Sequence, residues 1–168
     1  RRVAEALARG GRPGRVVRLS DRELDDLLAP RPAALAEAQG VRRVLRLLRE
    51  VRLADLREEL RRDAESLGPR AFLRERLGPL LTAVGRAWAD GDLSIRHEHA
   101  LTEVVEAVLR EVEASVPRPP GGPAIVLATL PDERHGLGLR MVAVECAAAG
   151  VPTVSLGPSL PLDEIATA

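Results

Sequence analysis

Apolar residues recur at intervals of three and four between residues 32 and 116, and this spacing predicts amphipathic helices. Glycines and one proline punctuate the pattern. The breaks divide the segment into four helices, at residues 32–50, 53–67, 70–90 and 95–116. Because the connections between them are short, neighbouring helices should run antiparallel, so the sequence predicts a four-helix bundle.

The pattern changes at a run rich in proline and glycine, residues 117–123, which neither a helix nor a central strand accommodates. The apolar run at 124–130 is typical of a strand buried on both faces. A helical segment at 136–149 and a second strand at 151–156 come next, and another helix begins at Leu162. These elements predict a parallel βαβ unit. The predicted fold class is therefore α plus α/β, a four-helix bundle followed by the start of a Rossmann-like, flavodoxin-like domain.

Three segments are expected along the chain. Residues 1–30 are interpreted as a linker, with short helical stretches at 3–9 and 21–29 on either side of a glycine and proline cluster. Residues 31–117 form the helical domain, and residues 118–168 form the first part of the α/β domain. Only about 50 residues follow the boundary, where a complete domain of this type has about 100 or more. We therefore expect an incomplete sheet, and the missing initiating methionine also indicates a fragment.

Charge and cysteine content narrow the classes of protein. The 25 basic residues are all arginine and are interspersed with 25 acidic residues, so the net charge of zero gives no electrostatic sign of nucleic-acid binding. Cys146 is the only cysteine, which excludes an internal disulfide and favours a reducing compartment, so we expect the protein in the cytoplasm. No run approaches the ~20 consecutive apolar residues of a membrane-spanning helix, and no signal peptide is recognisable.

The first candidate site follows the strand at 124–130, where Glu133, His135, Gly136 and Gly138 lie in the loop and the start of the next helix. Ligands of open parallel sheets bind beyond the carboxyl ends of the strands. A histidine there can reach a metal, and Glu133 is close enough to take the other ring proton and fix the tautomer. The two glycines let a large flat ligand approach the backbone. The alternative is a surface loop whose acidic residues stabilise the helix N-terminus.

The second candidate site combines Trp88 with Glu98 and His99, which follow it after nine intervening residues. Trp88 falls near the end of one predicted helix, and Ser94 is a suitable N-cap for the next, so the three side chains should lie at the same end of a helical hairpin. An indole plane beside a carboxylate and an imidazole can cover a shared ligand. The alternative is that Trp88 is a core residue and that Glu98, His99 and His97 form a solvated first turn.

The order of these features resembles one family. A helical bundle, a Trp-x9-Glu-His spacing, a proline-rich linker, a strand and a Glu-x-His-x-x-Gly loop are together similar to the cobalamin-binding photoreceptor regulators of the MerR family, of the CarH and LitR type. The resemblance covers residues 30–168. It includes the segment 151–162, which looks like the second strand and loop of that family's cobalamin fold.

The resemblance assigns roles to the residues of both candidate sites. It implies that His135 binds cobalt from below, in place of the cofactor's own dimethylbenzimidazole. It also implies that Trp88, Glu98 and His99 cover the group above the cobalt. The implied cofactor-binding residues are Trp88, Glu98, His99, Glu133, His135 and Gly138, with His135 as the metal ligand.

The resemblance implies gene regulation and no enzyme activity. The chain would be the cobalamin-binding sensory module of a transcriptional regulator that uses adenosylcobalamin and, in the family's light-sensing members, responds to light. Such regulators bind DNA through a winged helix-turn-helix domain that is not part of this chain, and a homo-oligomer is expected. Two departures limit the transfer. Ala89 follows Trp88 where some light-sensing members have a histidine, and the family's later Ser-x-Leu and Gly-Gly segments would lie beyond Ala168.

Two other functions fit parts of the pattern. A corrinoid carrier domain of a methyltransferase system also has a helical bundle before a cobalamin fold, although the Trp-x9-Glu-His spacing favours the regulator. A helical interaction module without a cofactor fits only if both motifs are incidental.

Overall fold

The computed structural model describes residues 3–4, 14, 19–28, 32–117 and 123–167. It comprises two compact units, residues 1–39 and 40–168. In the first unit, helix α3 (Asp21–Leu28) begins after Ser20, whose backbone N–H and hydroxyl donate to Glu23 at 2.8 and 2.6 Å. This reciprocal cap explains the helix start, and the helix predicted at 21–29 is confirmed. The stretch predicted at 3–9 lies largely outside the described residues.

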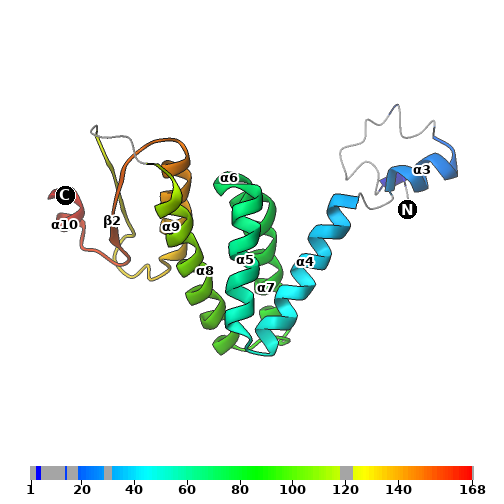
Figure 1. Cartoon of the computed structure of the whole chain (residues 1–168), viewed down its shortest axis with the longest axis horizontal. Helices are drawn as coiled ribbons and strands as arrows, with labels where there is room; N and C mark the ends of the chain where they lie inside the picture. Colours follow the sequence, from blue (N-terminus) through cyan, green and yellow to red (C-terminus); the bar gives the residue numbers. More distant parts are fainter. Residues whose placement is uncertain (1–2, 5–13, 15–18, 29–31, 118–122, 168) are drawn as a thin grey trace. The chain divides into compact units, whose positions relative to one another are not determined.

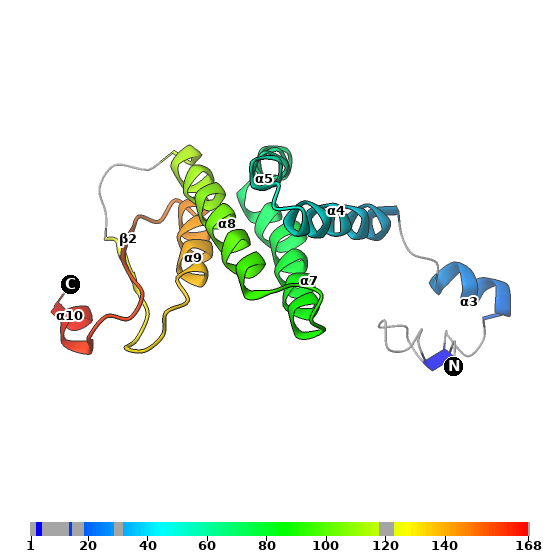
Figure 2. The same cartoon turned by 90° about the horizontal axis from the view of Figure 1, so that it is seen from below.

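The predicted helices of the bundle are confirmed, with ends that agree within two residues (Figures 1 and 2). They are α4 (Pro32–Arg49), α5 (Leu53–Leu67), the run from α6 (Pro69–Ala71) through the π-helical stretch η1 (Phe72–Leu77) into α7 (Gly78–Ala89), and α8 (Ile95–Ser115). Helix α8 packs along α5, and η1 packs against α5. Gly40 lies inside α4 and does not interrupt it.

The core of the second unit is built from leucine, valine, alanine and a single phenylalanine. Phe72 of η1 is fully buried. Around it, apolar side chains from α4, α5, η1, α7 and α8 form one cluster, including Val44, Leu48, Leu56, Leu60, Leu77, Leu80, Leu101, Val105 and Leu109. Burying each such side chain contributes about 1.5–3 kcal/mol. This core therefore fixes α7 and α8, the two helices that carry the second candidate site.

The run predicted as one helix at 70–90 contains a π-helical stretch, and Pro79 explains it. Proline has no backbone N–H, and its ring collides with the carbonyl four residues earlier in a regular helix, which here is that of Glu75. The backbone widens instead: the Gly78 N–H donates to the carbonyl of Leu73, five residues earlier. The proline then occupies the first turn of α7, where its missing donor costs little.

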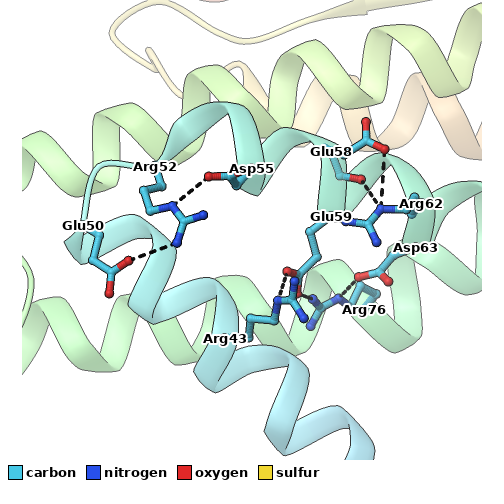
Figure 3. Close-up of polar contacts among 9 residues, drawn as sticks. All are labelled: Arg43, Glu50, Arg52, Asp55, Glu58, Glu59, Arg62, Asp63 and Arg76. Atoms are coloured by element: carbon cyan, nitrogen blue, oxygen red, sulfur yellow. Dashed lines mark hydrogen bonds and ion pairs between the residues drawn. The ribbon is translucent and has the colours of Figure 1, made fainter.

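A buried ion-pair network joins α4, α5 and η1 (Figure 3). Arg76 is 7% exposed; its Nη2 lies 3.3 Å from Glu59 Oε1, and its Nε pairs with Asp63. Glu59 Oε2 makes no well-aligned hydrogen bond among the described residues, but Arg43 Nε lies 2.6 Å away, so its charge is paired. The Arg76 guanidinium sits against Gly40, where a Cβ would lie 2.7 Å from Nη1.

The predicted βαβ unit is confirmed. Strands β1 (Ile125–Ala128) and β2 (Thr153–Gly157) pair in parallel, and α9 (Leu137–Ala148) connects them. A short helix α10 (Leu162–Thr167) follows. The expectation that the first strand is buried on both faces is wrong in the described chain, because Leu127 is buried but Ile125 is 46% exposed and Val126 is 37% exposed. A two-stranded sheet covered by one helix leaves most of its surface open.

Helix α9 attaches the sheet to the bundle. It packs against α8 and α6, with Ala143 and Val144 buried. Arg70 Nε lies 3.3 Å from Glu145 Oε2, and Arg140 Nη1 lies 4.0 Å from Glu113 Oε2, so two ion pairs border the packed surface. The start of α9, to which the loop after β1 leads, is thereby held beside α8. The division into segments 1–30, 31–117 and 118–168 stays a prediction.

The helices all carry charged residues. The longest, α8, has 21 residues and bears them along its whole length. Within the ranges that the structure describes, no helix has both the length and the hydrophobicity needed to cross a membrane.

Candidate functional site

The loop after β1 is tied to the loop after β2 by side-chain hydrogen bonds. The hydroxyl of Thr129 donates to the carbonyl of Glu133 at 2.6 Å and accepts from the backbone N–H of Ser159 at 2.8 Å. The Asp132 N–H in turn donates to the Ser159 hydroxyl at 3.2 Å. Both loops lie at the carboxyl ends of parallel strands, where open α/β sheets bind ligands. These bonds restrain the segment that carries His135.

Glu133 and His135 form a directed pair at this position. One carboxylate oxygen of Glu133, Oε1, accepts from the His135 backbone N–H at 2.8 Å and lies 2.6 Å from His135 Nδ1. A carboxylate can only accept, so the Nδ1 atom carries a proton, and in the neutral ring Nε2 keeps its lone pair. The His135 side chain is 90% exposed. The pair therefore presents Nε2 to a ligand in the tautomer that metals bind.

The electrostatics of the pair agree with its geometry. The backbone N–H of His135, and then its ring, hold the pKa of the Glu133 carboxyl below the ordinary value of 4.5. Glu133 is therefore ionised at neutral pH, as the hydrogen bond to the ring requires. That His135 ligates cobalt stays a prediction.

The two glycines of the loop have different surroundings. A side chain at Gly138 would meet nothing within 4 Å, so the backbone there is open to a ligand. A side chain at Gly136 would lie 3.8 Å from Glu106 Oε1, an atom of α8. Gly136 therefore marks the place where the His135 loop meets the bundle.

The turn between α7 and α8 is closed by backbone hydrogen bonds. The N–H groups of Asp92 and Leu93 both donate to the carbonyl of Ala87, at 2.9 and 3.1 Å. Gly91 has φ 79°, in the left-handed region that favours glycine. Leu93 is 3% exposed and anchors the turn in the core. The ends of the two helices are thus fixed relative to each other.

Trp88 and the Glu98–His99 pair lie at this end of the hairpin. Trp88 is 54% exposed, so the alternative that it is a core residue is wrong. His99 Nδ1 lies 3.0 Å from Glu98 Oε2, and the His99 side chain is 72% exposed. The described residues show no hydrogen bond between Trp88 and this pair. The hairpin therefore presents an apolar plane and a hydrogen-bonding pair to solvent.

Helix α8 joins the two candidate sites through Thr102 and Glu106, which the sequence analysis missed. They follow Glu98 at spacings of four, so the three residues lie along one face of α8. Thr102 donates to the Glu98 carbonyl at 3.0 Å, and Glu106 lies beside Gly136. Their spacing from Glu98 could have indicated Thr102 and Glu106 from the sequence. Sequence alone did not show which face of α8 meets the His135 loop.

The solvated-turn alternative is wrong for one residue. Glu98 and His99 are partly or largely exposed, but His97, which precedes them, is only 8% exposed.

Comparison with known proteins connects the bundle to cobalamin. Residues 38–113 match a family model described as the B12 binding domain. Over 119 residues the chain is 32% identical to the HTH-type transcriptional repressor CarH of Myxococcus xanthus, a similarity that covers 70% of this chain and 38% of that protein. The chain thus spans well under half of that relative's length. The two matches support a B12-binding, CarH-like module, and the family match contains Trp88, Glu98 and His99.

Proposed function

We propose that the chain is the cobalamin-binding sensory module of a transcriptional regulator. One observation carries the proposal: the hairpin that exposes Trp88 at the same end as Glu98 and His99 lies within residues 38–113, the region that matches the B12 binding domain. Trp88 is more than half exposed, so a partner that stacks on its indole removes apolar surface from water and gains binding free energy. A flat ligand of mixed polarity is such a partner.

The residues present fit cobalamin. His135 has its Nδ1 proton engaged by Glu133 and an exposed ring, as a metal ligand requires. In the proposed complex His135 would hold the cobalt, and Glu133 would hold the ring's tautomer. The open backbone at Gly138 accommodates the edge of the ring system. When bound, cobalamin supplies a cobalt–carbon bond that light or a chemical reaction can break.

Adenosylcobalamin is the form that the hairpin favours in this proposal. The Trp88 indole can stack on an adenosyl group, while Glu98 and His99 accept and donate hydrogen bonds to its polar atoms. A methyl group would gain little from either contact. Glu98, Thr102 and Glu106 line the face of α8 that leads from this end to the His135 loop.

In this proposal the module also responds to light. Ala89 gives no imidazole next to Trp88. His97 is buried, whereas His99 is exposed. In the illuminated protein we therefore expect no bis-imidazole absorption spectrum unless His99 supplies the second ring. A bis-imidazole spectrum that persists in the His97→Ala, His99→Ala double variant would refute this account of the upper face.

The remaining parts of the proposal concern the whole protein. A DNA-binding domain outside this chain would contact the operator, and the cofactor would set the oligomeric state of a homo-oligomer. The M. xanthus relative is named as a helix-turn-helix transcriptional repressor, which favours a regulator over an enzyme. A regulator that acts on DNA in a bacterial cell works in the cytoplasm.

The test is cobalamin binding by the full-length protein. We expect adenosylcobalamin to bind with the absorption spectrum of a base-off, histidine-ligated form, and His135→Ala to weaken binding or change that spectrum. Arg134→Gln is the matched control, because Arg134 is the exposed neighbour of His135. A protein that stays colourless after incubation with cobalamin, or a spectrum that His135→Ala leaves unaltered, would refute the assignment. A preference for methylcobalamin would favour the corrinoid-carrier alternative.

A further inference from the structure

His97 closes the first turn of α8 from inside the protein. It is the third helical residue after the N-cap Ser94 and is 8% exposed. The Ser94 N–H donates to His97 Nδ1 at 3.1 Å, and the Ser94 hydroxyl lies 2.9 Å from the same atom. Glutamate or glutamine commonly fills this position in a capping box, with a side-chain oxygen as the acceptor. Here an imidazole nitrogen takes that role.

The cap fixes the tautomer of His97. A backbone N–H can only donate, so Nδ1 must be the unprotonated nitrogen and Nε2 must carry the proton. Within the described part of the chain, the buried Nε2 has no hydrogen-bond partner. Leaving a buried donor unsatisfied is unfavourable. Among the described residues, the contacts with Ser94 are therefore the only hydrogen bonds that the His97 ring makes.

The cap determines where Glu98 and His99 point. Both follow His97 directly, and the Glu98 N–H reaches the Ser94 carbonyl at 3.4 Å, so both depend on the same first turn. Successive residues of a helix are rotated by about 100°, so a start displaced by one residue would turn both side chains away from their present direction. Trp88 would stay in place, because the Ala87 carbonyl and Leu93 hold its side of the turn.

We propose that His97 is a positioning residue, which orients Glu98 and His99 toward the ligand that Trp88 covers by fixing the start of α8. The consequence for a ligand rests on the proposed cobalamin function. The cap itself does not, so the two can be tested separately.

The first measurement needs no cofactor. Long-range ¹H–¹⁵N spectra of the chain should show His97 with its proton on Nε2. In His97→Leu, which keeps an apolar group of similar size but removes the acceptor, the Ser94 amide should exchange its hydrogen at least about fivefold faster, as loss of a cap implies. His97→Gln restores an acceptor and should return exchange to within about twofold of wild type. Arg96→Gln, at the exposed neighbouring position, should match wild type.

The second measurement uses the full-length protein with cobalamin. The ratio of its affinities for adenosylcobalamin and methylcobalamin should fall by about fivefold in His97→Leu and be retained in His97→Gln and Arg96→Gln. Three results would overturn the proposal. They are a proton on Nδ1 of His97, an unaltered Ser94 amide exchange rate in His97→Leu, and failure of His97→Gln to restore the exchange rate or the affinity ratio. If neither the wild-type protein nor any variant binds cobalamin, the proposed function fails. The exchange data alone then decide whether His97 caps α8.

Discussion

Replacing Gly40 by alanine should destabilise the bundle, although glycine-to-alanine changes inside helices normally stabilise. Gly40 lies within α4, where the change would gain about 1 kcal/mol from helix propensity alone. The new Cβ, however, would lie 2.7 Å from Nη1 of Arg76 and 3.2 Å from its Cζ. The end of an arginine side chain can usually move aside. This one is held between Glu59 and Asp63 in the buried network.

The size of the destabilisation depends on how far the Arg76 guanidinium must move. Ordinary contact begins near 3.4 Å, so Nη1 must move by roughly 0.7 Å, the difference between 3.4 and 2.7 Å. The Arg76–Glu59 contact is already 3.3 Å long and would lengthen further. Breaking a buried pair costs about 3–5 kcal/mol, and we assign about 2 kcal/mol to this partial displacement. The net expectation is a loss of about 1 kcal/mol in the free energy of unfolding.

Gly85→Ala is the matched control. Gly85 lies inside α7, and a side chain there would meet nothing within 4 Å, so this change should stabilise by about 1 kcal/mol. Urea unfolding followed by the fluorescence of Trp88, the only tryptophan, and by far-ultraviolet circular dichroism measures both variants. The free energies of unfolding of the two variants should differ by about 2 kcal/mol, which corresponds to a difference of about 1 M in the urea midpoint.

The Arg76→Ala background isolates the cause. There the obstacle is absent, and Gly40→Ala should become neutral or stabilising. Equal stabilisation by Gly40→Ala and Gly85→Ala in the wild-type background would refute the reasoning, because it would show that the guanidinium moves aside without losing its partners.

Three further predictions concern the candidate site. His135→Ala should leave the free energy of unfolding within about 0.5 kcal/mol of wild type, since the ring is exposed, while it changes the cobalamin spectrum; a large loss of stability would indicate a structural role. Trp88→Ala should reduce the preference for adenosylcobalamin over methylcobalamin, and equal preferences in wild type and variant would remove Trp88 from the site. The pKa of Glu133 is lowered from 4.5, so its hydrogen bond to His135 should be complete above that pH and lost as the pH falls through the lowered value. An NMR titration of the His135 amide should therefore inflect below pH 4.5. The inflection should be absent in Glu133→Gln.

The element pattern was accessible from the sequence because it depends on local periodicity. The helices of the bundle, both strands and the helix between them occur where the apolar spacing predicts them. The π-helical stretch was missed, although Pro79 is visible in the sequence. A proline inside a helical pattern indicates an interruption, but whether the helix kinks, ends or widens depends on what packs around it.

The parts of the site that depend on packing were less accessible. Motif spacing placed Trp88 on the hairpin, but only the structure shows that its indole is exposed rather than in the core. Sequence spacing placed Glu133 within reach of His135, two residues away. By contrast, the contact between Glu106 and Gly136 joins residues 30 apart, and no periodicity could indicate it. The sequence analysis grouped His97 with a solvated first turn. Its burial depends on how the start of α8 packs against the core, which local spacing does not reveal.

Helix α8 physically connects the two ends of the candidate site. Glu98 and Glu106 are separated by about 12 Å along it, at 1.5 Å per residue, and its buried face is held by α5 and α9. A change of ligand at the hairpin that tilts or frays this helix must therefore also alter the environment of the His135 loop. If the proposed function holds, thermodynamic linkage makes the effect reciprocal: the free energy by which a ligand at the hairpin changes binding at His135 equals the free energy by which binding at His135 changes affinity for the ligand at the hairpin.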